Sequence, residues 1–192
     1  MRAVFLAIPA AVVLSACVEA DMTIEILGED QARVTGFMQM QRSMFDMSGG
    51  DESFCPPEDG GTLTLTETHA RCDFDHTGSF DEIMSADADE DAPADLQGTI
   101  THLGGDRVRV LMPLGGMFDE MGDVEEDPQM LAMVQQMMAG MSITMQVKGR
   151  QIEESTGTIS ADGTRAYVIM DVDTIFAPLD QRISDFDTTL RY

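Results

Sequence analysis

Apolar and polar residues alternate in short runs along much of this chain, which is the period of β-strands with one buried face. Short connecting segments join these runs into three pairs: 22–26 with 32–40, 62–66 with 70–76, and 99–101 with 108–111. Two alternating runs joined by a short turn predict a β-hairpin. We therefore expect three successive hairpins in this part of the chain.

Two helices are indicated between and after these hairpins. Ser79 and Glu82 have the spacing of a capping box, which predicts a short helix ending near Met84. The stronger signal lies at residues 128–139, where a proline suits the first turn and a glycine follows the last. One apolar stripe runs along this longer helix: Leu131, Val134, Met138 and Met141.

The remaining sequence returns to strand period. Residues 143–147 alternate, and Asp162-Gly163 is a strong hairpin turn before the alternating run 167–172. The tail after Pro178 is acidic, and we expect it to be loosely held. The order of elements predicts an α+β fold, with a curved antiparallel sheet built from successive hairpins and packed on one main helix near residues 128–139.

The first residues carry the features of a secretory signal. Met1-Arg2 supplies positive charge, residues 3–14 are apolar, and Ser15-Ala16 are the small residues required before a peptidase cut. The apolar stretch is shorter than the roughly 20 residues that span a bilayer. We therefore predict that residues 1–16 are removed and that residues 17–192 form a single domain.

A cysteine distinguishes this signal from an ordinary secretory one. Leu14-Ser15-Ala16-Cys17 resembles the lipobox of bacterial lipoproteins, in which the cysteine becomes the first residue and carries acyl chains. The resemblance implies a protein of the bacterial cell envelope, anchored through the lipid on Cys17, since two or more chains anchor stably. Val18 stands where an Asp would resemble an inner-membrane retention signal, so the outer membrane, facing the periplasm, is favoured. The alternative is a simple signal with a chance cysteine.

The chain is strongly acidic, with a formal net charge of −24. Binding to phosphates requires clustered Lys and Arg, so nucleic acid is excluded as a partner. Electrostatic docking onto anionic lipid is disfavoured for the same reason. Many of the acidic residues lie near residues 85–95 and 119–127, which we expect to be solvated loops of this single domain.

If Cys17 is acylated, it cannot form a disulfide, which leaves two of the three cysteines. Cys55 and Cys72 then remain as a pair outside the cytoplasm, where disulfides persist. They flank a loop rich in proline and glycine, and a bond between them would contribute about 3 kcal/mol in the chain-entropy model. Redox pairs normally have the closer Cys-x-x-Cys spacing, so we predict a structural disulfide.

The order of elements resembles that of the LppM-type bacterial lipoproteins, with a lipobox, paired strands, and a helix before further paired strands. The nearest local match is residues 141–150, continuing through Gly157 to Val168. This chain has Lys148-Gly149 where that family has a Pro-Gly turn, and it lacks the aromatic residue that usually ends the last strand and the C-terminal membrane helix of many members. The resemblance implies a membrane-tethered domain with a groove for an apolar ligand, and it supplies no catalytic residues.

Methionine is unusually frequent, at 17 of 192 residues. Thioethers bind Cu(I) outside the cytoplasm, so an extracytoplasmic Cu(I)/metal-binding protein that uses Met and His is one hypothesis. His69, His76 and His102 could meet on neighbouring hairpins, but none belongs to a recognised ligand motif. Most methionines fall on faces predicted to be buried, where methionine fills irregular gaps. We therefore predict no metal site and no cofactor.

Surplus methionines on the helix at 128–139 suggest a ligand groove. One stripe suffices to pack a helix on a sheet, and several methionines lie off that stripe. The preceding Gly-rich stretch from Leu114 to Phe118 could act as a flap over them. The predicted apolar-ligand groove is therefore formed by Leu114, Met117, Phe118, Met130, Met133 and Met137. The alternative is a thicker core without a cavity.

Motifs of catalysis are absent from the sequence. It contains no nucleophile triad motif, phosphate loop or zinc-protease motif, and its carboxylates are too plentiful for any two to stand out as acid and base. We therefore predict a non-enzymatic, membrane-anchored lipoprotein that binds a lipid, another apolar small molecule or an envelope partner.

Overall fold

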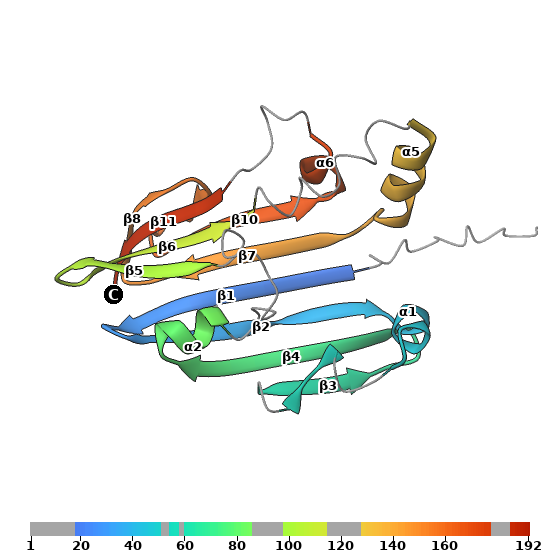
Figure 1. Cartoon of the computed structure of the whole chain (residues 1–192), viewed down its shortest axis with the longest axis horizontal. Helices are drawn as coiled ribbons and strands as arrows, with labels where there is room; N and C mark the ends of the chain where they lie inside the picture. Colours follow the sequence, from blue (N-terminus) through green and yellow to red (C-terminus); the bar gives the residue numbers. More distant parts are fainter. Residues whose placement is uncertain (1–17, 51–53, 58–59, 86–97, 115–127, 178–184) are drawn as a thin grey trace, which may run out of the picture.

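The computed structural model describes residues 18–50, 54–57, 60–85, 98–114, 128–177 and 185–192. Within these residues, eleven strands and four helices form an α+β fold, as the sequence predicts. The strands divide into two sheets, of seven and four strands (Figure 1). The predicted acidic loops near 85–95 and 119–127 fall almost wholly outside the described residues.

The larger sheet contains the first two predicted hairpins and the last one. Its strands, in spatial order, are β3 (Gly61–Leu65), β4 (His69–Gly78), β2 (Gln31–Gln41), β1 (Val18–Gly28), β7 (Ser142–Lys148), β10 (Arg165–Asp171) and β9 (Thr158–Ile159). Neighbouring strands are antiparallel, except for β1 and β7, which are parallel. Parallel neighbours need a long crossover, and here the chain passes through β2 to β6 and α5 before it returns.

The smaller sheet joins the third predicted hairpin to two strands that the sequence does not predict. Its spatial order is β5 (Thr99–Gly104), β6 (Arg107–Pro113), β11 (Asp185–Arg191) and β8 (Gln151–Ser155). The prediction that the tail after Pro178 is loosely held is wrong for β11. Phe186, Thr188 and Leu190 alternate on one face and are 0% exposed. The buried Thr188, together with Asp187 and Thr189 between these side chains, conceals the strand from a hydrophobicity pattern.

The helices are short. They are α1 (Arg42–Met47), α2 (Phe80–Ser85), α5 (Pro128–Met137) and α6 (Val172–Ile175). The predicted capping box begins α2: the Ser79 amide donates to Glu82 Oε2 at 2.8 Å, and the Glu82 amide donates to Ser79 Oγ at 3.3 Å. Within the described residues, no helix is both long enough and apolar enough to cross a membrane.

The core lies between the two sheets. Inward-pointing residues of β1, β7 and β10 meet those of β6, β8 and β11 in a single cluster. Phe186, Val108 and Val147 are among its largest fully buried side chains. Helix α2 extends the second layer over β2 and β4 and contributes the buried Phe80 and Ile83. Burial of these side chains is the main favourable term that holds the two layers together.

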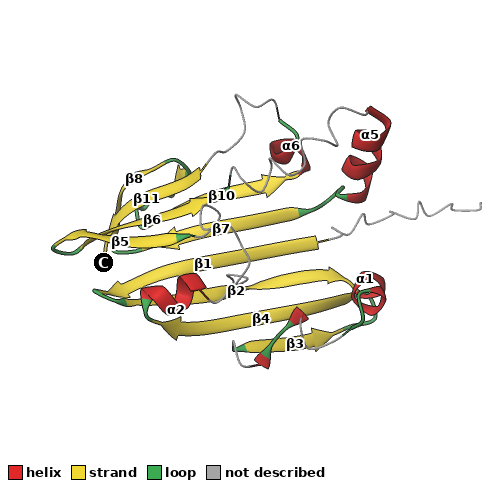
Figure 2. Cartoon of the chain, viewed as in Figure 1, coloured by secondary structure: helices red, strands yellow, loops and turns green. Residues whose placement is uncertain are grey.

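Helix α5 lies at the end of the larger sheet where β1 begins (Figure 2). The sequence predicts that the helix near residues 128–139 packs on the sheet. In the structure, the smaller sheet and α2 pack on the larger sheet instead. A helix of 10 residues is about 15 Å long, and seven strands are about 30 Å wide. The helix cannot cover such a surface, whereas a second sheet can.

The predicted disulfide is present between Cys55 and Cys72, whose Cα atoms are 5.4 Å apart. Both cysteines are buried, and Cys72 lies in the middle of β4. The bond holds the loop before β3 against the larger sheet. This placement fits a structural role, as the sequence predicts.

Candidate functional site: the apolar face of the larger sheet

One face of the larger sheet carries rows of apolar side chains across β1, β2, β4 and β3. Paired residues on neighbouring strands point to the same face of a sheet. Val18 pairs with Met40, Met40 with Ala70, and Ala70 with Leu65, so one apolar row crosses four strands. The next row on this face crosses the same strands through Ala20, Met38, Cys72 and Leu63.

The opposite face of the same strands is polar. Arg71 lies there between the carboxylate of Asp73, at 2.8 Å, and the ring of Phe37, whose centroid is 3.6 Å from the guanidinium carbon. Gln146 donates to the Asp21 carboxylate at 3.1 Å across β1 and β7. These contacts fix which side of each strand faces the core and which faces solvent.

The smaller sheet and α2 cover only part of the apolar face. Ile24, Ile26 and Val147 lie beneath that layer and belong to the core. Met22 and Met145, one row further out, are half-buried and pack against the edge of the core. The apolar face continues beyond this edge, toward the start of β1.

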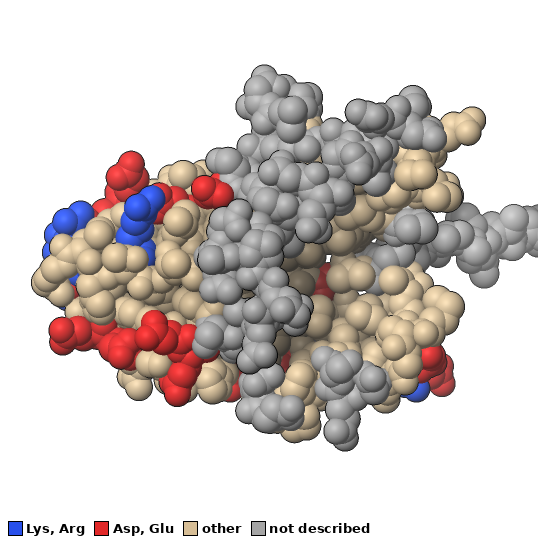
Figure 3. All heavy atoms as spheres, in the orientation of Figure 1, with Lys and Arg blue, Asp and Glu red and all other residues tan. Residues whose placement is uncertain are grey.

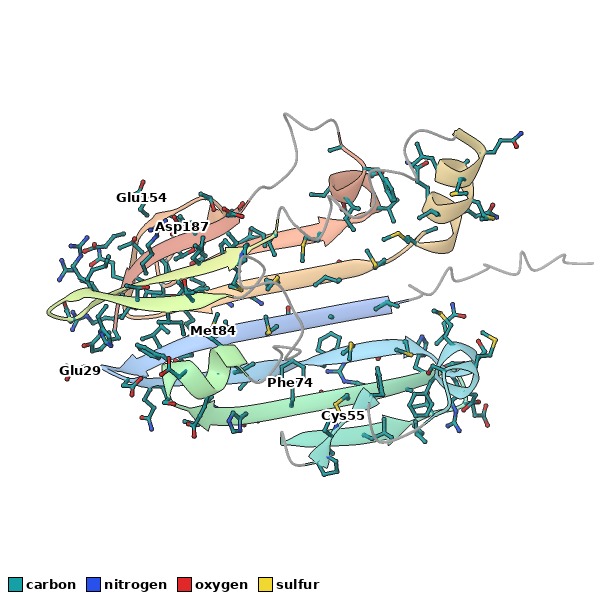
Figure 4. The ribbon with its side chains drawn as sticks, viewed as in Figure 1. Glu29, Cys55, Phe74, Met84, Glu154 and Asp187 are labelled. Atoms are coloured by element: carbon teal, nitrogen blue, oxygen red, sulfur yellow. A yellow bond between two sulfur atoms is a disulfide. The ribbon has the colours of Figure 1, made fainter. Side chains whose placement is uncertain are left out.

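We call the part of the face beyond the core the outer apolar rows. They consist of Val18, Ala20, Met38, Met40, Leu63 and Leu65, none of which packs in the core cluster. The first four are half-buried, whereas Leu63 is 37% and Leu65 45% exposed. Phe74 lies beside these rows on β4, facing Gly36, and Cys55 lies close to it near β3 (Figure 4).

Charged side chains lie mainly away from the outer apolar rows. On the face shown in Figure 3, Asp, Glu, Lys and Arg gather over the left part, and the right part carries mostly uncharged atoms of the described residues. One ion-pair group lies near the C-terminus, where Glu153 accepts from Arg107 at 2.7 Å and from Arg191 at 2.6 Å. The hydrogen bond from Arg107 is the largest cause that lowers the pKa of Glu153, and the one from Arg191 lowers it further. Desolvation opposes both effects.

The predicted groove residues do not all come together. Leu114 is buried in the core between the sheets, whereas Met130 and Met133 are exposed on α5. Met117, Phe118 and the side chain of Met137 lie outside the described residues. The groove between this helix and the sheet therefore stays a prediction. The sequence did not point to the outer apolar rows as a site, although the alternation in β1 and β2 is the signal that could have located them.

The histidines do not form a cluster. His69 and His76 are seven residues apart on β4, which separates them by about 23 Å. His102 stacks on Phe80, with ring centroids 5.2 Å apart. The expectation that the three could meet on neighbouring hairpins is wrong, because His69 and His76 lie far apart along one strand. In the part of the chain that the structure describes, no group of three His, Cys, Asp or Glu side chains could hold a metal ion.

Methionines of the larger sheet face apolar residues on neighbouring strands, and in one case another methionine. Met22 faces Met145 in the neighbouring strand β7, and both pack against the core. Met38 faces Cys72, and Met40 faces Ala70. Such packing uses methionine as a flexible apolar side chain, whereas a copper site needs thioethers that converge on one point.

Two surface depressions lie elsewhere. One, of about 300 Å³, is on the outer face of the smaller sheet, where Arg109 and Asp187 form an ion pair. The other, of about 210 Å³, is on the polar face of the larger sheet, beside Gln146 and Tyr167. Polar side chains dominate the first, and neither contains residues of the outer apolar rows.

Comparison with known proteins gives a distant likeness in structure. No protein-family model matches the chain, and no curated protein matches its sequence. The folded domain of LppM from Mycobacterium tuberculosis, solved by NMR, is similar in structure, with a TM-score of 0.49 at 13% sequence identity. The match covers 93% of this chain and 91% of that domain. A likeness of this degree assigns no function to individual residues.

Proposed function

We propose that this protein is a membrane-anchored lipoprotein of the bacterial cell envelope whose domain holds an apolar molecule on the outer apolar rows. The observation that carries the proposal is the extent of the apolar face, which continues beyond the layer that covers the core. Apolar side chains that the fold leaves partly exposed on one face commonly mark a binding site.

The side chains of the outer apolar rows suit an apolar ligand of variable shape. Met38 and Met40 have unbranched, flexible side chains that adapt to irregular surfaces. Leu63 and Leu65 lie in the same rows at the edge of the sheet, beyond the buried Ala70 and Cys72 of β4. These rows offer no charged group to a ligand, which favours acyl chains or another hydrocarbon over a polar metabolite.

The anchor in this proposal is the lipid on Cys17. Its support is the lipobox Leu14-Ser15-Ala16-Cys17 behind an apolar signal stretch. The proposed role is binding without catalysis, because the outer apolar rows present neither a nucleophile nor an acid–base pair. Val18, in place of an aspartate after the anchor, favours the outer membrane.

Lipid analysis of two matched variants tests the binding. Met38 and Gln39 are neighbours on β2 whose side chains point to opposite faces of the sheet. Met38→Glu and Gln39→Glu therefore add the same charge at the apolar and the polar face. We expect mass spectrometry of extracts from washed, purified protein to find bound lipid in the wild type and in Gln39→Glu, and several-fold less in Met38→Glu.

Equal lipid content in the two variants, or a wild type without lipid, would contradict the proposal. A copper titration of the same samples separates the metal-binding alternative. Tight one-to-one Cu(I) binding that is lost in Met38→Leu/Met40→Leu would favour that alternative, because this double variant keeps the apolar surface and removes both thioethers.

A further inference from the structure

We infer that the end of the domain where β1 begins rests on a bilayer of zwitterionic lipid, with the exposed methionines of α1 and α5 in contact with the lipid. This inference rests on the anchor in the proposed function and adds an orientation and a contact surface to it. It does not depend on whether the outer apolar rows bind a ligand.

The anchor leaves almost no linker. Val18 is the first residue of β1, and Cys17 precedes it directly. Consecutive Cα atoms are about 3.8 Å apart, so acyl chains on Cys17 would begin within one residue of the larger sheet. This end of the sheet must then lie at the membrane surface.

Two helices flank the start of β1. Val18 pairs with Met40, and α1 begins two residues later, at Arg42. Glu19 pairs with Ser142, which follows the end of α5 by a short turn. Figure 1 shows both helices at the right-hand end of the molecule, where β1 begins.

These helices expose methionine at that end. Met47 is 80% and Met44 37% exposed on α1, and Met133 is 56% and Met130 46% exposed on α5. Figure 4 shows sulfur atoms, in yellow, on both helices. Exposed apolar side chains on two helices at one end of the sheet, on either side of a lipid anchor, fit the interfacial region of a bilayer.

The charges of the two helices also favour uncharged lipid. The sequence of α5, PQMLAMVQQM, contains no Asp, Glu, Lys or Arg. On α1, Arg42 and Asp46 form an ion pair at 2.8 Å, so their charges compensate each other. The chain as a whole carries −24, which opposes binding to anionic lipid. The occupant is therefore the apolar interface of zwitterionic lipid.

This arrangement points the opposite end of the domain away from the membrane. Leu27, in β1 before the turn to β2, is nine residues from Val18 and so about 30 Å from the anchored end. Glu29 lies at this far tip in Figure 4. Leu27 is 45% exposed, which makes it a matched reporter position.

Tryptophan fluorescence tests the inference on the full, acylated chain. The sequence contains no Trp, so each introduced Trp is a unique reporter. Met47→Trp, Met133→Trp and Leu27→Trp would be reconstituted into phosphatidylcholine vesicles with or without brominated acyl chains. We expect bromine to reduce the emission of Met47→Trp and Met133→Trp about twofold, because interfacial helices sink several ångströms into lipid, and to leave Leu27→Trp unchanged.

Vesicle flotation separates the two possible failures. Protein that floats with the vesicles but shows no quenching at residues 47 and 133 would overturn the orientation and leave the anchor intact. Equal quenching at residue 27 would also overturn it, because the domain would then lie flat. Wild-type protein that does not float would refute the anchor and the orientation together. If one methionine variant does not fold, the other reports on its own helix.

Discussion

Gly36 is the residue at which the larger sheet leaves least room for a side chain. A Cβ atom at this position would lie 1.9 Å from the Asp21 carbonyl oxygen and 3.0 Å from the tip of the Phe74 ring. The first neighbour is backbone and cannot move without disturbing the pairing of β1 and β2. The glycine therefore permits the close approach of these strands beside the outer apolar rows.

Gly36→Ala is expected to lower the free energy of unfolding by about 1 to 3 kcal/mol, as overpacking usually does. Chemical denaturation measures this difference. Gly28→Ala is the matched control, because no atom lies within 4 Å of its Cβ position. A loss in Gly36→Ala no larger than that in Gly28→Ala would show that the strands can separate without cost.

The hairpin turn before β10 holds the carboxylate of Asp162 with three hydrogen bonds. The Ser160 hydroxyl donates to it at 2.6 Å, and the Thr164 amide and hydroxyl donate at 3.1 and 2.9 Å. These hydrogen bonds, that of Ser160 first, lower its pKa from 3.8 to about 2. Stabilisation from the ionised group is present above the unfolded pKa and disappears as the pH falls through the folded pKa.

We therefore expect an NMR titration of the Asp162 carboxyl carbon to give a pKa near 2. The corresponding loss of stability should fall between about pH 4 and pH 2 and should be absent in Asp162→Asn. A carboxyl that titrates at the ordinary value for Asp would contradict the three hydrogen bonds described for this turn.

At the scale of elements, the disulfide ties a loop to β4, the strand next to the edge of the larger sheet. Cys55 and Cys72 are 17 residues apart in sequence, and both are buried. We expect the double variant Cys55→Ser/Cys72→Ser to lose about 3 kcal/mol of stability, since a loop of this length gains that much from closure. Alkylation and mass measurement of the exported protein without reductant should find neither thiol free, and two free thiols would refute the bond.

Strand β11 is the element whose loss should damage the fold most. It lies between β6 and β8, and its inward side chains fill the centre of the core. Phe186→Ala is expected to cost about 3 to 5 kcal/mol, the usual range for a fully buried aromatic residue. Leu103→Ala, at an exposed position on β5, should change stability by less than about 0.5 kcal/mol. Similar unfolding midpoints for the two variants would contradict the central place of β11.

The sequence predicts the local elements well and the long-range ones poorly. Hairpins such as β1–β2 depend on a turn and two adjacent alternating runs, and the cap of α2 depends on Ser79 and Glu82 alone. Strand β11 instead pairs with strands far away in the sequence: Arg109 and Asp187 meet across 78 residues. Strand β8, QIEES, offers one apolar residue, Ile152, and so gives no periodic signal.

The candidate site was missed for a related reason. Alternation in β1 and β2 correctly indicates one apolar face, but it does not tell how much of that face a second layer covers. Coverage depends on the smaller sheet, half of whose strands were not predicted. The apolar surplus on α5 therefore predicts a groove beside that helix, whereas the outer apolar rows lie on β1, β2 and β3.

At the scale of the whole molecule, the two ends of the strands carry different exposed side chains. Ion pairs such as that of Arg191 with Glu153 lie near the C-terminus, and exposed methionines lie at the end where β1 begins. Surface ion pairs contribute little to stability, so this distribution is better explained by what each end contacts. Exposed methionines beside the proposed anchor and ion pairs at the other end fit a domain held upright on a membrane.

The anchor itself gives the last prediction. The core is formed by residues from Met22 onward, so replacing Cys17 should remove the lipid without changing the packing. We expect Cys17→Ser to lose metabolic palmitate labelling and to leave the membrane fraction, with an unfolding midpoint equal to that of the wild-type domain. Equal labelling of the two proteins, or a wild type that is freely soluble, would refute the anchor. Loss of labelling together with a lower midpoint would mean that the segment around Cys17 also stabilises the fold.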